Sequence, residues 1–124
     1  MVYDEDNTFA KILRGEIPCN RVYEDDFALA FRDVRPQAPV HVLVIPKGAY
    51  SDASDFATNA PKHLILGFYQ AVAQTAQELG LASQDKGNGY RLIANAGADG
   101  RQEVPHFHVH IMGGGDIGPM VSCD

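Results

Sequence analysis

The chain has 124 residues, of which 45% are hydrophobic and 21% are charged, and its formal net charge at pH 7 is −6. This balance predicts one soluble domain over residues 1–124, and the acidic charge argues against a nucleic-acid-binding surface, which needs clustered Lys and Arg. We expect neither a membrane span nor a signal peptide, because no apolar run approaches about 20 residues and the first residues are acidic, so a cytoplasmic location is the default expectation.

The first half of the chain predicts a short helix followed by three strands. Residues 8–14 place apolar side chains on one helical face, with Asn7 or Thr8 as the N-cap and Gly15 as the stop. The strands are predicted from β-branched and aromatic runs bounded by turn residues, at 21–24, 27–33 and 40–46. The first two strands flank Asp25-Asp26, which predicts a tight hairpin.

The second half predicts one long helix and two further strands. Residues 47–60 are small and polar and predict a loop with room for one helical turn near 53–57. The long helix is expected over about 61–79, between Pro61 and Gly80. The last two strands are expected at 89–95 and 105–112.

This order of elements predicts an α+β fold with a mostly antiparallel sheet of about five strands. One face of the sheet should be buried under the long helix. The two cysteines, Cys19 and Cys123, are far apart in sequence and belong to no C-x-x-C pair, so both are expected to be free thiols.

Three of the five histidines lie in the stretch HFHVHIM at residues 106–112. Because side chains alternate across a strand, His106, His108 and His110 should share one face, and the apolar residues between them should pack under the helix. Three neighbouring imidazoles would repel one another if all were protonated, so at least one should be neutral near pH 7 and available as a nucleophile or a metal ligand. His63, near the start of the long helix, is expected to be a surface residue.

Three interpretations of this histidine pattern are open. One is a solvated edge strand with no function. The second is a metal site, with Asp116 or Glu103 as a further ligand, because neutral imidazole is a common zinc ligand. The third is chemistry at phosphorus, with an imidazole as the nucleophile.

The stretch HFHVHIM resembles the signature of the histidine triad (HIT) family, in which three histidines alternate with apolar residues. Other stretches resemble the family in the same order: IP at 17–18, YEDD at 23–26, AFRDVRPQAPVHVLVIPK at 30–47, GYRL at 89–92, Asn95 with Gly97, QEV at 102–104 and GG at 113–114. The resemblance covers nearly the whole chain. It is to the branch that contains purine nucleoside phosphoramidases.

The resemblance implies a catalytic role for four histidines. His108 would attack the α-phosphorus of a nucleotide and form a covalent nucleotidyl-histidine, which water then hydrolyses. His110 would bind a non-bridging phosphate oxygen, and His106 would help proton transfer to the leaving group. His41 resembles the family's fourth histidine and would hydrogen-bond the first member of the triad, His106.

The resemblance also implies the substrate-binding residues. Asp33 matches the carboxylate that accepts hydrogen bonds from the ribose hydroxyls. The walls of the purine pocket correspond to Phe9, Ile12, Phe31 and Val34. The loop on the phosphate side corresponds to Asn95, Arg101, Gln102 and Glu103. An ionised carboxylate cannot donate a hydrogen bond to phosphate, so we expect the backbone N–H at Glu103 to make that contact, with its side chain turned away or paired with Arg101.

Some relatives carry Cys-x-x-Cys near the N-terminus as part of a zinc site, but the matching stretch here is residues 7–10, NTFA, so we expect neither a structural zinc nor a cofactor. The resemblance further implies a two-fold homodimer joined through the sheets, with the long helix and strand 89–95 at the interface. The tail through Met120 would then reach the site of the partner. Three functions are compared: a nucleotide hydrolase or transferase, a nucleotide-binding regulatory protein, and a metal-binding protein.

Overall fold

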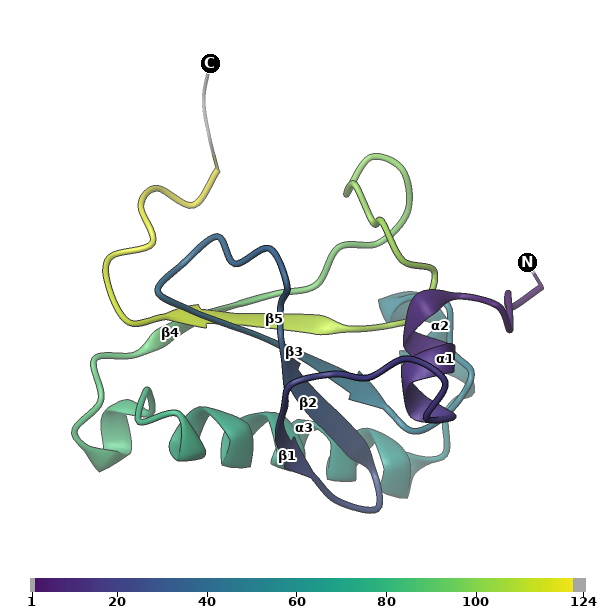
Figure 1. The fold of residues 1–124 in the computed structure, drawn as a ribbon, viewed down its shortest axis with the longest axis horizontal. Helices are drawn as coiled ribbons and strands as arrows, with labels where there is room; N and C mark the ends of the chain where they lie inside the picture. Colours follow the sequence, from purple (N-terminus) through teal and green to yellow (C-terminus); the bar gives the residue numbers. More distant parts are fainter. Residues whose placement is uncertain (1, 122–124) are drawn as a thin grey trace.

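The computed structural model describes residues 2–121, and its centre is an antiparallel sheet of five strands (Figure 1). The strands are β1 (Arg21–Glu24), β2 (Ala28–Arg32), β3 (Val40–Pro46), β4 (Tyr90–Ile93) and β5 (Val109–Gly113). Their order in the sheet is β1-β2-β3-β5-β4, so β1 and β4 are the edge strands and β3 and β5 lie side by side. The predicted α+β class and the five-stranded antiparallel sheet are confirmed.

The long helix α3 (Lys62–Glu78) runs along one face of the sheet (Figure 1). Its buried residues pack against the alternate side chains of the strands that point the same way, including Val42 and Val44 of β3 and Val109 and Ile111 of β5. Phe107 joins this cluster and stacks on Phe56, with 4.7 Å between ring centroids. Period-two alternation in the strands thus supplies the helix-covered core.

The opposite face of the sheet carries a second, smaller cluster beneath the helix α1 (Thr8–Leu13). We call it the α1-side cluster, and it consists of Phe9, Leu29, Phe31, Leu43 and Ile45, with Ile12, Leu13 and Val104 partly buried around it. The alternate residues of β3 therefore divide between two environments, and His41 falls on the α1 side together with Leu43 and Ile45.

Local capping explains where several elements begin and turn. The Asn7 side chain accepts a hydrogen bond from the Ala10 backbone N–H and caps α1, so Asn7 is the cap of the two predicted candidates, Asn7 and Thr8. One carboxylate oxygen of Asp25 accepts from the N–H groups of both Phe27 and Ala28, and this closes the predicted hairpin between β1 and β2.

Three element predictions were wrong in extent, and one of them is β4, which covers only Tyr90–Ile93 of the predicted strand 89–95. The segment 53–57 belongs to a full helix, α2 (Ala53–Asn59), which begins at an Asp52 N-cap; a short 3-10 helix, η1 (Ser83–Asp85), was not predicted. The last strand begins at Val109 instead of residue 105. Its neighbour β3 ends at Pro46, which has no N–H for a further ladder bond, and the N–H of Phe107 donates instead to the Tyr50 carbonyl.

No helix within residues 2–121 is long and apolar enough to cross a membrane. Cys19 is exposed and forms no disulfide, whereas Cys123 lies outside the described residues.

Candidate active site

Four histidines meet on the α1 side of the sheet. His41 lies on β3 and His110 on β5, while His106 and His108 lie on the segment that leads into β5. The ring centroids of His108 and His110 are 5.1 Å apart, and so are those of His41 and His110. The predicted alternation holds through residue 111, although only His110 of the three triad histidines belongs to a regular strand.

His108 is held by a backbone group. Its Nδ1 lies 2.7 Å from the carbonyl oxygen of His106, which can only accept, so we assign the ring proton to Nδ1 and the free lone pair to Nε2. The side chain is 6% exposed and its ring packs edge-on against Phe9. Burial lowers the pKa of His108, while its bond to the carbonyl and the charges of Asp33 and Glu103 act in the opposite direction. A neutral imidazole with an open Nε2 is a competent nucleophile.

His41 and His110 form a chain of hydrogen bonds. The backbone N–H of Gln37 donates to Nδ1 of His41 at 3.0 Å, so we place the proton of neutral His41 on Nε2, which lies 2.9 Å from Nδ1 of His110. Neutral His110 then carries its own proton on Nε2. Burial lowers the pKa of His110 to about 4. The expectation that His41 bonds the first triad histidine was wrong, because the antiparallel pairing of β3 with β5 brings it to the last one instead.

His106 faces away from open solvent, with 0% exposure. Its Nε2 lies 3.3 Å from the Pro46 carbonyl, and its Nδ1 lies 2.6 Å from the hydroxyl of Tyr3. Burial lowers the pKa of His106 to about 4. Both ring nitrogens therefore have protein partners. Sequence reasoning missed Tyr3, which is separated from His106 by 103 positions and belongs to no motif.

The residues expected to bind a nucleoside differ in how far their side chains are exposed to solvent. Phe9 and Phe31 are buried and meet edge-on at 5.5 Å, and Ile12 packs beside them. Asp33 is half-buried; one carboxylate oxygen accepts from the Arg35 backbone N–H, and the other lies 3.4 Å from Nε2 of His41. Val34 is 93% exposed, so the structure does not bring it into the α1-side cluster.

The loop before the triad is tied down by one side chain. Gln102 accepts from the Gly97 N–H and donates to the carbonyls of Ser51 and Val104. Arg101 has φ of 58°, in the left-handed region that favours glycine. Asn95 is half-buried, and Glu103 is exposed at the end of the loop. Gln102 therefore holds the loop through its side chain, and the substrate contact expected of it from the sequence stays a prediction.

One group of possible metal ligands is present among the described residues, formed by Asp33, His41 and His110. Their candidate ligand atoms lie within 4.8 Å of one another. However, Nδ1 of His41 already accepts from Gln37, so metal binding through Nε2 would leave neither ring nitrogen with a proton and would require the imidazolate anion. The donor set therefore fits a hydrogen-bonded relay better than a metal centre.

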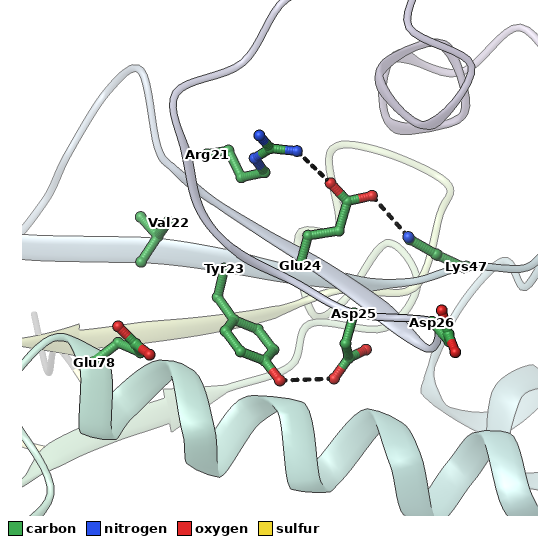
Figure 2. Close-up of a pocket in the computed structure, with 8 residues that line it drawn as sticks. All are labelled: Arg21, Val22, Tyr23, Glu24, Asp25, Asp26, Lys47 and Glu78. Atoms are coloured by element: carbon green, nitrogen blue, oxygen red, sulfur yellow. Dashed lines mark hydrogen bonds and ion pairs between the residues drawn. The ribbon is translucent and has the colours of Figure 1, made fainter.

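A separate cleft of about 550 Å³ lies beside the hairpin of β1 and β2 (Figure 2). Four of its six charged side chains are paired within the cleft: Glu24 accepts from Arg21 and lies 2.7 Å from Nζ of Lys47, and Tyr23 donates to Asp25. None of the site residues predicted from the sequence lines this cleft. It is therefore distinct from the histidine cluster.

Comparisons with known proteins agree with this arrangement. Residues 14–117 match a protein-family model described as the HIT domain. A HIT-like protein of 13.2 kDa from Azospirillum brasilense is 51% identical over 120 residues, which covers 97% of this chain and 95% of the relative. The purine nucleoside phosphoramidase of Escherichia coli K12 is 42% identical over 119 residues, which covers 95% of each chain.

Solved structures agree as well. A histidine triad protein from Clostridium difficile superimposes with a TM-score of 0.83 at 38% identity, covering 97% of this chain and 100% of the other. A HIT family hydrolase from Clostridium thermocellum gives the same TM-score at 36% identity, covering 96% and 99%.

Proposed function

Because the chain belongs to the HIT family, we propose that it is a nucleotide hydrolase or transferase that cleaves purine nucleoside monophosphate conjugates at the α-phosphorus. The bond cleaved would join phosphorus to nitrogen or to another phosphate. The observation that carries the proposal is Nε2 of His108, which keeps its lone pair because Nδ1 is held by the His106 carbonyl, and which has no hydrogen-bond partner among residues 2–121.

In the proposed first step, the lone pair on Nε2 of His108 attacks phosphorus. A phosphorus–nitrogen bond forms to the protein, and the bond to the leaving group breaks with its electron pair. An amine leaving group takes up one proton as it departs. In the second step water attacks the nucleotidyl-histidine, releases the nucleoside monophosphate and restores the imidazole.

His110 is the proposed stabiliser of the charge on the phosphate. The chain from the Gln37 N–H through His41 leaves the Nε2 proton of neutral His110 free to donate to a non-bridging oxygen. His110 can donate this hydrogen bond while its ring is neutral, so the bond does not require an imidazolium. This is consistent with the lowered pKa of His110.

The nucleoside would bind beside the same histidines. Phe9, Phe31 and Ile12 offer the flat apolar surface that suits a purine, and Asp33 has a partly exposed carboxylate for the ribose hydroxyls. Phe9 also contacts the His108 ring, so the base and the attacked phosphorus would lie on the two sides of one residue. Gln102 would contribute by fixing the loop through Gly97 and Arg101 next to the phosphate.

A turnover assay tests the proposal. Purified protein is mixed with adenosine 5′-phosphoramidate, and release of AMP is followed by chromatography. His108→Ala should reduce turnover by about 10³-fold or more, because it removes the nucleophile. His63→Ala, which removes an exposed histidine from α3, is the matched control and should retain wild-type turnover.

The outcomes separate the competing functions. AMP that binds the wild-type protein without any release of AMP from the phosphoramidate would favour a nucleotide-binding regulatory protein. Wild-type turnover in His108→Ala would remove the nucleophile assignment. Acid-labile labelling of the wild-type protein by a ³²P-labelled substrate, lost in His108→Ala, would support the covalent intermediate.

We also infer a homodimer. Leu66 and Tyr69 on α3 and Tyr90 and Leu92 on the edge strand β4 are exposed apolar side chains, and β4 pairs with no strand on its outer edge among residues 2–121. Sedimentation velocity should give the mass of a dimer. Leu92→Asp should shift the protein toward monomer, whereas Val2→Asp on the N-terminal segment should not.

A further inference from the structure

The N-terminal segment reaches the histidine cluster through one side chain, Tyr3. Its hydroxyl lies 2.6 Å from Nδ1 of His106, and the two rings meet edge-on with centroids 5.7 Å apart. Tyr3 belongs to no sequence motif, and the proposed mode of nucleotide binding gives it no role. The contact joins the start of the chain to the segment that carries the proposed nucleophile.

The segment around Tyr3 is fixed at several points. The Asn7 side chain donates to the Asp4 carbonyl and, through its oxygen, caps α1 at Ala10. Arg14, just after α1, donates to the Glu5 carbonyl. Tyr3 is therefore positioned by the same helix whose Phe9 contacts His106 and His108.

The two partners of His106 determine which ring nitrogen carries its proton. The Pro46 carbonyl can only accept, so Nε2 must be the protonated nitrogen in a neutral ring. Nδ1 is then an acceptor that is buried from solvent, and the Tyr3 hydroxyl supplies its donor. Without that hydroxyl, Nδ1 would be a buried acceptor with no donor, which favours a rotated ring or the other tautomer.

We propose that Tyr3 is a positioning residue for catalysis, which holds His106 in its Nε2–H tautomer and thereby fixes the backbone carbonyl that orients His108. The carbonyl of His106 lies 2.7 Å from Nδ1 of His108, so the orientation of the proposed nucleophile depends on the residue that Tyr3 holds. This inference rests on the proposed function for its kinetic consequence, but not for its structural one.

The same contacts change the role of His106. Its side chain is fully buried and both ring nitrogens are occupied, so no ring proton is available to a leaving group. In this arrangement His106 acts through its backbone and its fixed ring. His106 is thus a positioning residue as well, and the proton for the departing amine must come from a group other than the His106 ring.

Tautomers of histidine can be read directly from long-range ¹H–¹⁵N correlations of a ¹⁵N-histidine-labelled protein. In the wild-type protein at pH 7, Nδ1 of His106 should show the shift of an unprotonated, hydrogen-bonded acceptor, and Nε2 that of a protonated nitrogen. In Tyr3→Phe the aromatic ring stays and only the hydroxyl is lost, so the Nδ1 resonance should move toward that of a free acceptor or an exchanging tautomer. Tyr23→Phe, which removes a hydroxyl bonded to Asp25 at the β1–β2 hairpin, is the matched control and should leave all histidine resonances unchanged.

Turnover of adenosine 5′-phosphoramidate provides the second readout. Tyr3→Phe should lower kcat by roughly 10-fold and change KM less than twofold, since His106 touches no substrate atom in the proposed geometry. A His106 resonance that is unchanged in Tyr3→Phe, or a wild-type His106 with its proton on Nδ1, overturns the inference. The wild-type spectrum gives that answer even if Tyr3→Phe fails to fold, and it does so even if the wild-type protein has no turnover and the proposed function fails.

Discussion

Lowering the pH from 7 to 4.5 should destabilise the folded chain through its buried histidines, and His106 gives the clearest measure. The residue is 0% exposed, and burial lowers its pKa from 6.5 to about 4. Between pH 6.5 and about pH 4 the unfolded chain binds a proton at His106 and the folded chain does not. The contribution of His106 to the free energy of unfolding is therefore at its full value above about pH 6.5, and it decreases as the pH falls toward 4.

The expected loss is large for a domain of this size. A gap of about 2.5 pH units at about 1.4 kcal/mol per unit amounts to about 3.5 kcal/mol, of which about 2.5 kcal/mol is lost by pH 4.5. His108 and His110 shift in the same direction, so the total loss should be greater. The pKa of Glu24 is lowered by Lys47 and that of Asp55 by the Ser51 backbone, but these contributions decline only below their ordinary values of 4.5 and 3.8.

Urea unfolding of the wild-type protein and of His106→Phe at pH 7.0, 6.0, 5.0 and 4.5 measures the effect. At pH 7 the variant should be less stable by about 1–3 kcal/mol, because the Tyr3 hydroxyl and the Pro46 carbonyl lose their partner. At pH 4.5 this difference should shrink by about 2.5 kcal/mol, because phenylalanine binds no proton. His63→Gln should follow the wild-type curve. A constant difference between the wild-type protein and His106→Phe over the whole range would refute the reasoning.

Two further predictions concern packing and the loop. Gly67→Ala should destabilise the fold by about 1–3 kcal/mol in urea unfolding, because its Cβ would lie 2.4 Å from Cγ of Phe27; a gain in stability, as helix propensity alone predicts, would contradict the packing. Gln102→Ala should speed amide hydrogen exchange at Gly97 and lower turnover, because the loop loses its bonds to Ser51 and Val104; unchanged exchange would show that the loop is held by other contacts.

Strong local signals allowed much of the fold to be predicted. The Asn7 cap, the Asp25 turn and the β-branched run that ends at Pro46 each depend on neighbours in sequence, and each is found where the pattern placed it. The apolar spacing of α3 and the alternation through Phe107 and Val109 also predicted which face of the sheet would be covered. These features are set by periodicity and by capping chemistry.

The parts that could not be predicted depend on contacts between distant segments. The start of β5 at Val109 is determined by where its neighbour β3 runs out of donors. The partner of His41 depends on the register between two strands, and the partner of His106 depends on the path of the N-terminal segment. No spacing within the motif encodes which nitrogen of each ring is protonated, because backbone carbonyls and N–H groups from other elements decide it.

The alternation of side chains along β3 makes the position of His41 and the packing of the core depend on the same strand register. His41, Leu43 and Ile45 face α1, and Val42 and Val44 face α3, so sliding this strand by one position would turn imidazole inward under the helix and valine outward. Such a molecule would lose its core together with the alignment of the proposed catalytic histidines. A population of well-folded but misassembled protein should therefore be negligible, and specific activity should track the folded fraction of a preparation.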